Sequence, residues 1–282
     1  RVALMPLRLN QKLLLLALAA GAFIFLFLTY GVSDWGFAIP RRGQKLLAIA
    51  LVGFAIAYST VIFQTLTNNR ILTPTIIGFD ALYLVIQTAT VFLFGATALT
   101  MVGKTEQFVF NAGAMVLFAG MLYRWLFGKE GRNLYVLVLV GIVFGSLFGS
   151  LSSFMQMLIS PNDFVVLQDR MFASFNNVKT ELLGIASVAV LLAFAFSLRY
   201  ARYLDVLSLG REQAINLGVD YQRVVNRFMV VIAILVSVST ALVGPITFFG
   251  LIVANLAHQW MQTYRHLYLV SAAVLLSLIS LV

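Results

Sequence analysis

The sequence predicts an all-α protein that crosses a membrane many times, and three observations carry that prediction. Of its 282 residues, 61% are hydrophobic and only 10% are charged, which is far outside the range of soluble domains. Apolar runs of about 20 residues, the length that spans a hydrocarbon core, recur along the chain. These runs do not alternate apolar and polar residues as the strands of a membrane barrel do. We therefore expect residues 1–282 to form a single transmembrane bundle of helices.

The apolar runs divide the chain into about nine expected spans. They lie at roughly residues 13–31, 45–66, 75–97, 106–127, 134–158, 182–199, 224–243, 246–262 and 267–282. The run from Met229 to Ala257 is too long for one span, and Gly244-Pro245 divides it. Because proline suits the first turn of a helix, we expect a new helix to begin there.

The basic residues indicate how the chain is oriented. Placing the N-terminus in the cytoplasm leaves most of the 19 lysines and arginines on the cytoplasmic side, as the positive-inside rule requires. The exceptions are Arg41, Arg42, Lys45, Lys104, Arg170 and Lys179. The net charge of +9 is thus spread over connecting segments rather than gathered in one patch, which argues against nucleic acid as a partner.

Two connecting segments are long enough to have a role of their own. The external one, from Pro161 to Glu181, contains a weakly amphipathic stretch at about 164–176 that suits a short helix near the outer surface. The cytoplasmic one, at about 203–220, contains "SLGREQAINLGVD", which predicts a helix from Gly210 to Leu217 ended by Gly218.

This short cytoplasmic helix needs support from outside its own sequence, because so few residues are marginally helical alone in water. Ala214, Ile215 and Leu217 are expected to form a small apolar ridge, with Arg211 and Glu212 facing water. Two interpretations remain open: a helix that rests on lipid headgroups, or one that docks into a groove of a soluble partner.

Patterns typical of enzymes and metal sites are missing from the sequence. The chain has no cysteine, and its two histidines, His258 and His266, do not form an HExxH motif. No GxxxxGKS/T phosphate loop occurs, so any use of ATP has to come from a partner. We therefore expect no enzymatic activity and no cofactor or metal bound by the chain itself.

Three blocks of the sequence together match a known pattern. In the cytoplasmic segment, Leu209, Gly210, Ala214, Leu217 and Gly218 form a Leu-Gly-x-x-x-Ala-x-x-Leu-Gly pattern. The other two blocks are "IPRRGQKLLAIALVGFAIAYSTVIFQTLTNNRILTPTIIGFD" and "VGPITFFGLIVANLAHQW". The three blocks resemble the FecCD-type permeases of ATP-binding-cassette (ABC) importers for iron chelates and cobalamin, whose second and third blocks begin Leu-Pro-Arg and Gly-Pro-Ile-x-Phe-x-Gly-Leu. The resemblance extends from the first span to the end of the chain.

Departures from the family pattern bear on the cargo. Asn69-Arg70 stands where the family usually has Asn-Pro, and Ala254-Asn255 where it has Pro-His. Together with "QDRMFASFNN", these changes look most like a subgroup for ferric siderophores, with a catecholate siderophore as one possibility, and they weaken a cobalamin assignment.

The resemblance implies an assembly with several partners. Two permease chains, identical or homologous and each with ten spans, would join two cytoplasmic ATPase subunits that bind ATP and Mg²⁺, and a binding protein would deliver the chelate. The tenth span would follow Val282. The resemblance implies a type II importer permease in the bacterial cytoplasmic membrane. It also implies that the permease contacts the ATPase through Leu209, Gly210, Arg211, Glu212, Ala214, Leu217 and Gly218. For Arg211 and Glu212, a merely solvated surface is the alternative.

Further roles are implied at the outer side. Arg41 matches a family position that meets carboxylates of the binding protein, and Arg42 stands in for a second arginine whose place is taken by Ala38. Anchoring of a helix at the headgroups is the alternative for both arginines.

The resemblance also implies that the second, fifth and neighbouring spans line the translocation path. The pathway residues proposed in the fifth span are Gly145, Ser146, Gly149, Ser150 and Ser153, and tight helix packing is the alternative for the glycines, which together with Gly141 recur at four-residue spacing. Asp80 is an acid near a membrane interior, where either function or the dipole of a helix start explains it.

Two other classes compete with the permease reading. An ion-coupled secondary transporter of a small organic solute would explain Asp80, but it predicts inverted repeats and further intramembrane charges that the sequence does not offer. A subunit that serves only assembly would leave transport unchanged when the pathway residues are altered.

Overall fold

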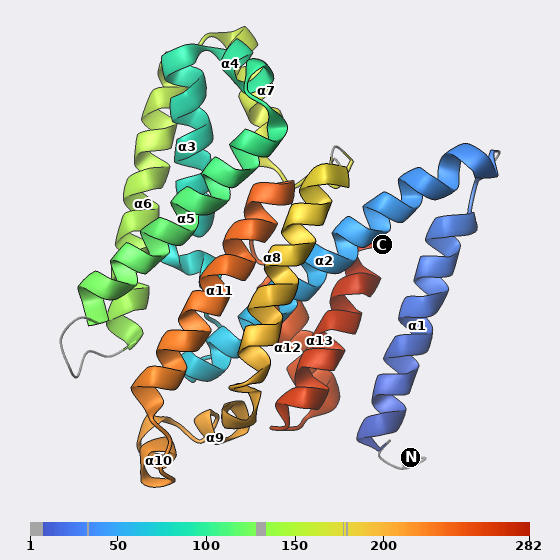
Figure 1. Ribbon diagram of the computed structural model, residues 1–282, viewed down its shortest axis with the longest axis vertical. Helices are drawn as coiled ribbons and strands as arrows, with labels where there is room; N and C mark the ends of the chain where they lie inside the picture. Colours follow the sequence, from blue (N-terminus) through green and yellow to red (C-terminus); the bar gives the residue numbers. More distant parts are fainter. Residues whose placement is uncertain (1–7, 33, 128–133, 177, 179) are drawn as a thin grey trace, which may run out of the picture.

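The computed structural model describes residues 8–32, 34–127, 134–176, 178 and 180–282; Lys179, which we expected on the outer side, lies outside these residues. The described elements, shown in Figure 1, are α1 (Leu9–Thr29), α2 (Trp35–Thr67), the 3-10 helix η1 (Pro74–Ile77), α3 (Phe79–Phe94), α4 (Ala96–Met101), α5 (Lys104–Phe127), α6 (Leu134–Leu158), α7 (Pro161–Met171), α8 (Thr180–Leu198), the 3-10 helix η2 (Ala201–Tyr203), α9 (Leu204–Leu207), α10 (Arg211–Asn216), α11 (Tyr221–Val243), α12 (Phe249–Met261) and α13 (His266–Leu281).

Every expected span is occupied by a helix, which confirms the all-α, multi-pass fold. Among the described residues, 6 helices are long and apolar enough to cross a membrane, namely α1, α2, α5, α6, α8 and α11. The apolar helices α3 and α13 are shorter, and α12 has 13 residues. The exact number of spans therefore stays a prediction.

The second helix begins about ten residues earlier than expected, so Arg41 and Arg42 are helical. The Asp34 side chain accepts hydrogen bonds from the backbone N–H groups of Gly36, at 2.9 Å, and Phe37, at 3.3 Å. This N-cap satisfies donors that a helix start otherwise leaves unpaired. Pro40 lies inside the helix, in its second turn, where it removes one backbone hydrogen bond without ending the helix.

The helix α11 ends directly before Gly244, as the sequence predicts, but the next helix does not start at Pro245. Gly244 has φ +95° and Phe248 has φ +63°, so both adopt left-handed conformations that interrupt the helix. The helix α12 therefore begins at Phe249 rather than near 246.

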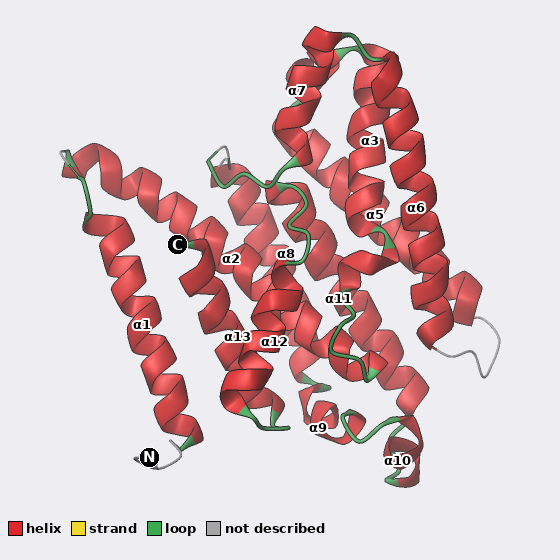
Figure 2. Cartoon of the chain, turned by 180° about the vertical axis from the view of Figure 1, so that it is seen from behind, coloured by secondary structure: helices red, strands yellow, loops and turns green. Residues whose placement is uncertain are grey.

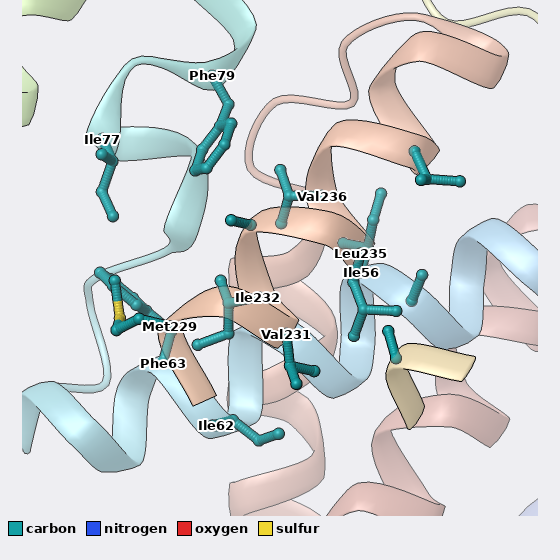
Figure 3. Packing of buried hydrophobic residues seen from close by; sticks show 14 of the residues in the cluster. Ile56, Ile62, Phe63, Ile77, Phe79, Met229, Val231, Ile232, Leu235 and Val236 are labelled. Atoms are coloured by element: carbon teal, nitrogen blue, oxygen red, sulfur yellow. The ribbon is translucent and has the colours of Figure 1, made fainter. Parts of the chain in front are cut away.

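The helices α2 and α11 pass through the middle of the bundle and form its core. Figure 3 shows Ile62 and Phe63 of α2 beside Met229 and Ile232 of α11. The Phe63 and Ile232 side chains are fully buried. Helices in lipid associate through close packing rather than the hydrophobic effect, so this fit is a main source of cohesion.

Two groups of short helices lie at opposite ends of the bundle. Figures 1 and 2 show α9 and α10 at one end, and α4 and α7 at the other. The helix α7 starts at Pro161 and ends at Met171, which corrects the expected range of 164–176. It begins early because the Ser160 hydroxyl accepts a hydrogen bond from the Asp163 N–H at 3.2 Å.

Candidate functional site

The segment that we expect to be cytoplasmic, at about 203–220, folds as its sequence predicts. The helix α10 covers Arg211–Asn216, with Gly210 at its N-cap and Leu217 at its C-cap. Gly210 has φ +97° and Gly218 has φ +83°, conformations that glycine adopts without the strain of a Cβ atom. The two glycines therefore set where this six-residue helix starts and ends.

The apolar ridge of α10 divides into an inner and an outer part. Ala214 has no exposed surface and belongs to the hydrophobic core, whereas Leu217 is 64% exposed and Leu209 is 57% exposed. Arg211 and Glu212 are exposed as well, and the Arg211 guanidinium lies 5.9 Å from the centre of the Tyr221 ring. Ala214 thus anchors α10 to the body, while the two leucines offer an apolar surface for a partner.

A histidine ties this segment to the transmembrane helices. The Asp205 carboxylate on α9 lies 2.6 Å from Nδ1 of His266 and also accepts a hydrogen bond from the His266 backbone N–H at 2.9 Å. Nε2 of the same ring lies 2.8 Å from the Thr65 hydroxyl on α2. Hydrogen bonds therefore connect α9 to both α2 and α13.

No pattern in the sequence indicates the link between Asp205 and His266. Asp205 and His266 are 61 residues apart, and neither forms part of a recognisable motif. The two histidines look equivalent in the sequence, yet the side chain of His258 makes no hydrogen bond within the described residues.

The glycines of α6 serve two different purposes. A Cβ atom on Gly141 would lie 2.6 Å from the Cα of Ile77, and a Cβ atom on Gly145 would lie 3.4 Å from the Cα of Gly78. These glycines let α6 approach the η1 turn closely. Gly149 has no atom within 4 Å of such a position. Packing therefore accounts for Gly141 and Gly145, but not for Gly149.

The serines expected in the pathway lie on the uncovered face of α6. Ser146, Ser150 and Ser153 are all exposed, among large apolar residues such as Leu139 and Met157. By contrast, Ser152 is buried and lies 2.8 Å from the Thr88 hydroxyl on α3. The helix therefore uses one face to pack on α3 and leaves a mixed apolar and hydroxyl face open.

Asp80 lies in the first turn of α3, beside the segment that joins α11 to α12. Its Oδ2 accepts a hydrogen bond from the Thr247 hydroxyl at 3.4 Å. Its Oδ1 is buried, with no hydrogen-bond partner among the described residues. The position at a helix start favours a carboxylate, whereas the buried, unpaired Oδ1 disfavours one. The role of Asp80 stays a prediction.

The two outer arginines differ in how they are held. The Arg42 guanidinium donates to the carbonyl oxygens of Phe27, at 2.6 Å, and Tyr30, at 2.8 Å, at the end of α1. A cation at this position satisfies carbonyl groups that a helix end leaves unpaired. Arg41 is exposed, with its guanidinium 4.1 Å from the centre of the Phe37 ring. Arg42 therefore has a structural contact, and Arg41 remains available at the surface.

Comparison with known proteins identifies the family. A profile of the FecCD transport family matches residues 19–282. The petrobactin import system permease protein YclO of Bacillus subtilis (strain 168) is 53% identical over 276 residues, which make up 98% of this chain and 88% of that protein. The petrobactin import system permease protein FatC of Bacillus anthracis is 40% identical over 231 residues, 82% of this chain and 65% of that protein.

A solved structure agrees in fold. It is described as an inward-facing conformation of a metal-chelate type ABC transporter, and it superposes with a TM-score of 0.77 at 23% identity over 97% of this chain and 88% of that one. Since the family profile covers nearly the whole chain and a permease of that kind is 53% identical over 98% of it, the protein belongs to the FecCD transport family.

Proposed function

We propose that this chain is the membrane permease subunit of an ABC importer that carries a ferric siderophore into the cytoplasm. The observation that supports this most strongly is the 53% identity, over nearly the whole chain, to a petrobactin import permease. The siderophore of that relative is the first cargo to test. The catecholate character expected from the sequence stays a prediction.

The proposal assigns the energy supply to other subunits. Two cytoplasmic ATPase subunits bind ATP and Mg²⁺, so the permease itself has no catalytic residue. Each ATPase receives one α10 helix, and the exposed Leu209 and Leu217 side chains enter its surface with Arg211 and Glu212 at the rim. Gly210 and Gly218 shape the helix, and Ala214 anchors it.

The uncovered face of α6 belongs, in this proposal, to the translocation path and to the contact with a second permease subunit. Its hydroxyl groups, with Gly149 between them, give a bulky chelate a wall that binds it weakly. Exposed apolar residues such as Leu139 and Ile142 suit contact with another helix or with lipid.

The proposed contacts of α10 with the ATPase and of the binding protein with the opposite end also assign an orientation to the chain in the membrane. The N-terminus and α10 lie on the cytoplasmic side of a bacterial cytoplasmic membrane, and α7 lies outside, where a substrate-binding protein docks. The opposite placement of α10 and α7 in the bundle supports this assignment.

Uptake into proteoliposomes tests the function. Vesicles that contain the permease, its ATPase and the binding protein are expected to accumulate ferric petrobactin only with internal ATP and Mg²⁺. Cobalamin supplied in the same way, with the same binding protein, should not accumulate. Uptake that persists without the ATPase and follows a proton gradient would contradict the proposal and support the ion-coupled transporter.

Replacing Arg41 by glutamate is expected to slow association of the binding protein about tenfold at low salt, since exposed charges mainly steer encounter. The rate is measured by surface-immobilised binding kinetics across salt concentrations. Arg265→Glu, the same charge change at an exposed position, is the control. Equal effects of both variants would remove Arg41 from the docking surface.

A further inference from the structure

A polar cavity of about 250 Å³ lies toward the α7 end of the bundle. It is lined by the first two turns of α5, the first turn of α8, the last residues of α11, Tyr83 of α3, the end of α7 and the chain that follows α7. None of its lining residues belongs to α6, so the cavity is separate from the face proposed for the translocation path.

The chain after α7 closes the cavity and is fixed to the end of α11. The Ser174 N–H donates a hydrogen bond to the Val243 carbonyl oxygen at 2.7 Å. A Cβ atom on Gly244 would lie 3.0 Å from the carbonyl oxygen of Phe172, so only glycine permits this approach without a shift. The wall is therefore a built part of the fold and not a loose loop.

Two cations line the cavity without a counter-ion. Lys104 and Arg170 form no ion pair with any described residue. The one acid in the lining is Asp169, which leaves an excess of positive charge. Cations that line a concave site favour an anionic ligand.

Two buried hydrogen-bonding groups also line the cavity. Tyr83 is 4% exposed and Asn111 is 5% exposed, and both side chains line the cavity. Neither has a hydrogen bond to the described residues and neither has a fully buried polar atom left unpaired, so their polar groups are accessible from the cavity. Tyr83, Asn111 and the two cations therefore place hydrogen-bond donors on several walls of the cavity.

From this arrangement we infer that the cavity binds a phosphate-type oxyanion, held by Lys104, Arg170, Asn111 and Tyr83. The several oxygens of a tetrahedral anion accept hydrogen bonds from different directions, as these walls require. Free phosphate and the headgroup of an anionic phospholipid share this chemistry, and basic pockets between transmembrane helices suit such headgroups. The bound anion would join α7 to α5 and α3, which carry these four side chains.

The test uses the full chain, purified in nanodiscs of zwitterionic lipid. Its thermal unfolding is followed in titrations with inorganic phosphate, with chloride at equal ionic strength, and with short-chain phosphatidylglycerol or phosphatidylcholine. A ligand that binds the folded protein raises the unfolding temperature with concentration. We expect this rise with phosphate, with phosphatidylglycerol or with both, and the active probe identifies the source.

Three variants separate a specific site from general charge attraction. Arg170→Gln and Asn111→Leu are each expected to weaken binding of the active probe about tenfold or more, the loss expected for a charge-assisted or buried hydrogen bond. Arg265→Gln, an exposed cation outside the cavity, should leave binding unchanged. No rise with either probe would overturn the inference, as would equal weakening by Arg265→Gln and Arg170→Gln.

Discussion

Replacing Leu217 by glutamate is expected to reduce ATP-dependent uptake at least about tenfold while the permease remains folded. The side chain is 64% exposed at the C-cap of α10, so the substitution disturbs nothing inside the protein. A carboxylate placed in an apolar docking cleft loses its hydration without gaining a partner. Uptake, ATPase co-purification and the unfolding temperature are measured on the same preparation.

Tyr264→Glu is the matched control for this variant, since Tyr264 is 70% exposed in the connection between α12 and α13. It should keep normal uptake and a normal complex. If Leu217→Glu also transported normally, α10 would be a helix at the lipid surface rather than a docking element. Parallel Arg211→Ala and Glu212→Ala variants show whether the charged rim adds to the leucine contact.

Replacing Gly141 by leucine is expected to destabilise the protein, whereas the same change at Gly149 should lower only transport. At Gly141, the new side chain would collide with the backbone of Ile77, because its Cβ alone would lie 2.6 Å from the Ile77 Cα. Overpacking of this kind costs about 1–3 kcal/mol or more. At Gly149 no atom lies within 4 Å, so leucine fits and narrows the proposed path. Unfolding temperature, complex formation and uptake distinguish the two effects.

The pair of variants can fail in two informative ways. Loss of assembly in Gly149→Leu would mean that this face packs against a second subunit without lining a path. Normal uptake in a folded Gly149→Leu complex would remove Gly149 from the pathway.

The positions of the helices and of the breaks between them are the features of this fold that the sequence predicts best. Apolar runs of membrane length leave few alternatives to helices, because unpaired backbone groups are costly in lipid. The limits of α10 followed from Gly210 and Gly218, whose positive φ values mark its two ends. The break at Gly244 was predictable for the same reason, but the delayed start of α12 depends on the left-handed conformation of Phe248.

Properties that depend on distant contacts were not accessible. Local pattern placed Ala214 on an apolar ridge, yet only the packed structure distinguishes it, fully buried, from the exposed Leu217. The contacts of Arg42 with the end of α1 join two helices, and the sequence around Arg42 does not indicate them. The link from Asp205 to His266 and the cavity around Asn111 each join segments far apart in the chain, so no local spacing reveals them.

Cross-linking from α10 tests the central claim most directly, that this chain is driven by a separate ATPase. The protein has no cysteine, so Leu217→Cys introduces a single thiol at the proposed contact, and Ser153→Cys introduces one on the open face of α6. In membranes that contain the assembled transporter, a short thiol-to-amine cross-linker should join the Leu217→Cys variant to the ATPase subunit, whereas the Ser153→Cys variant should give no ATPase adduct. An active transporter in which the Leu217→Cys variant forms no adduct with the ATPase would contradict the account.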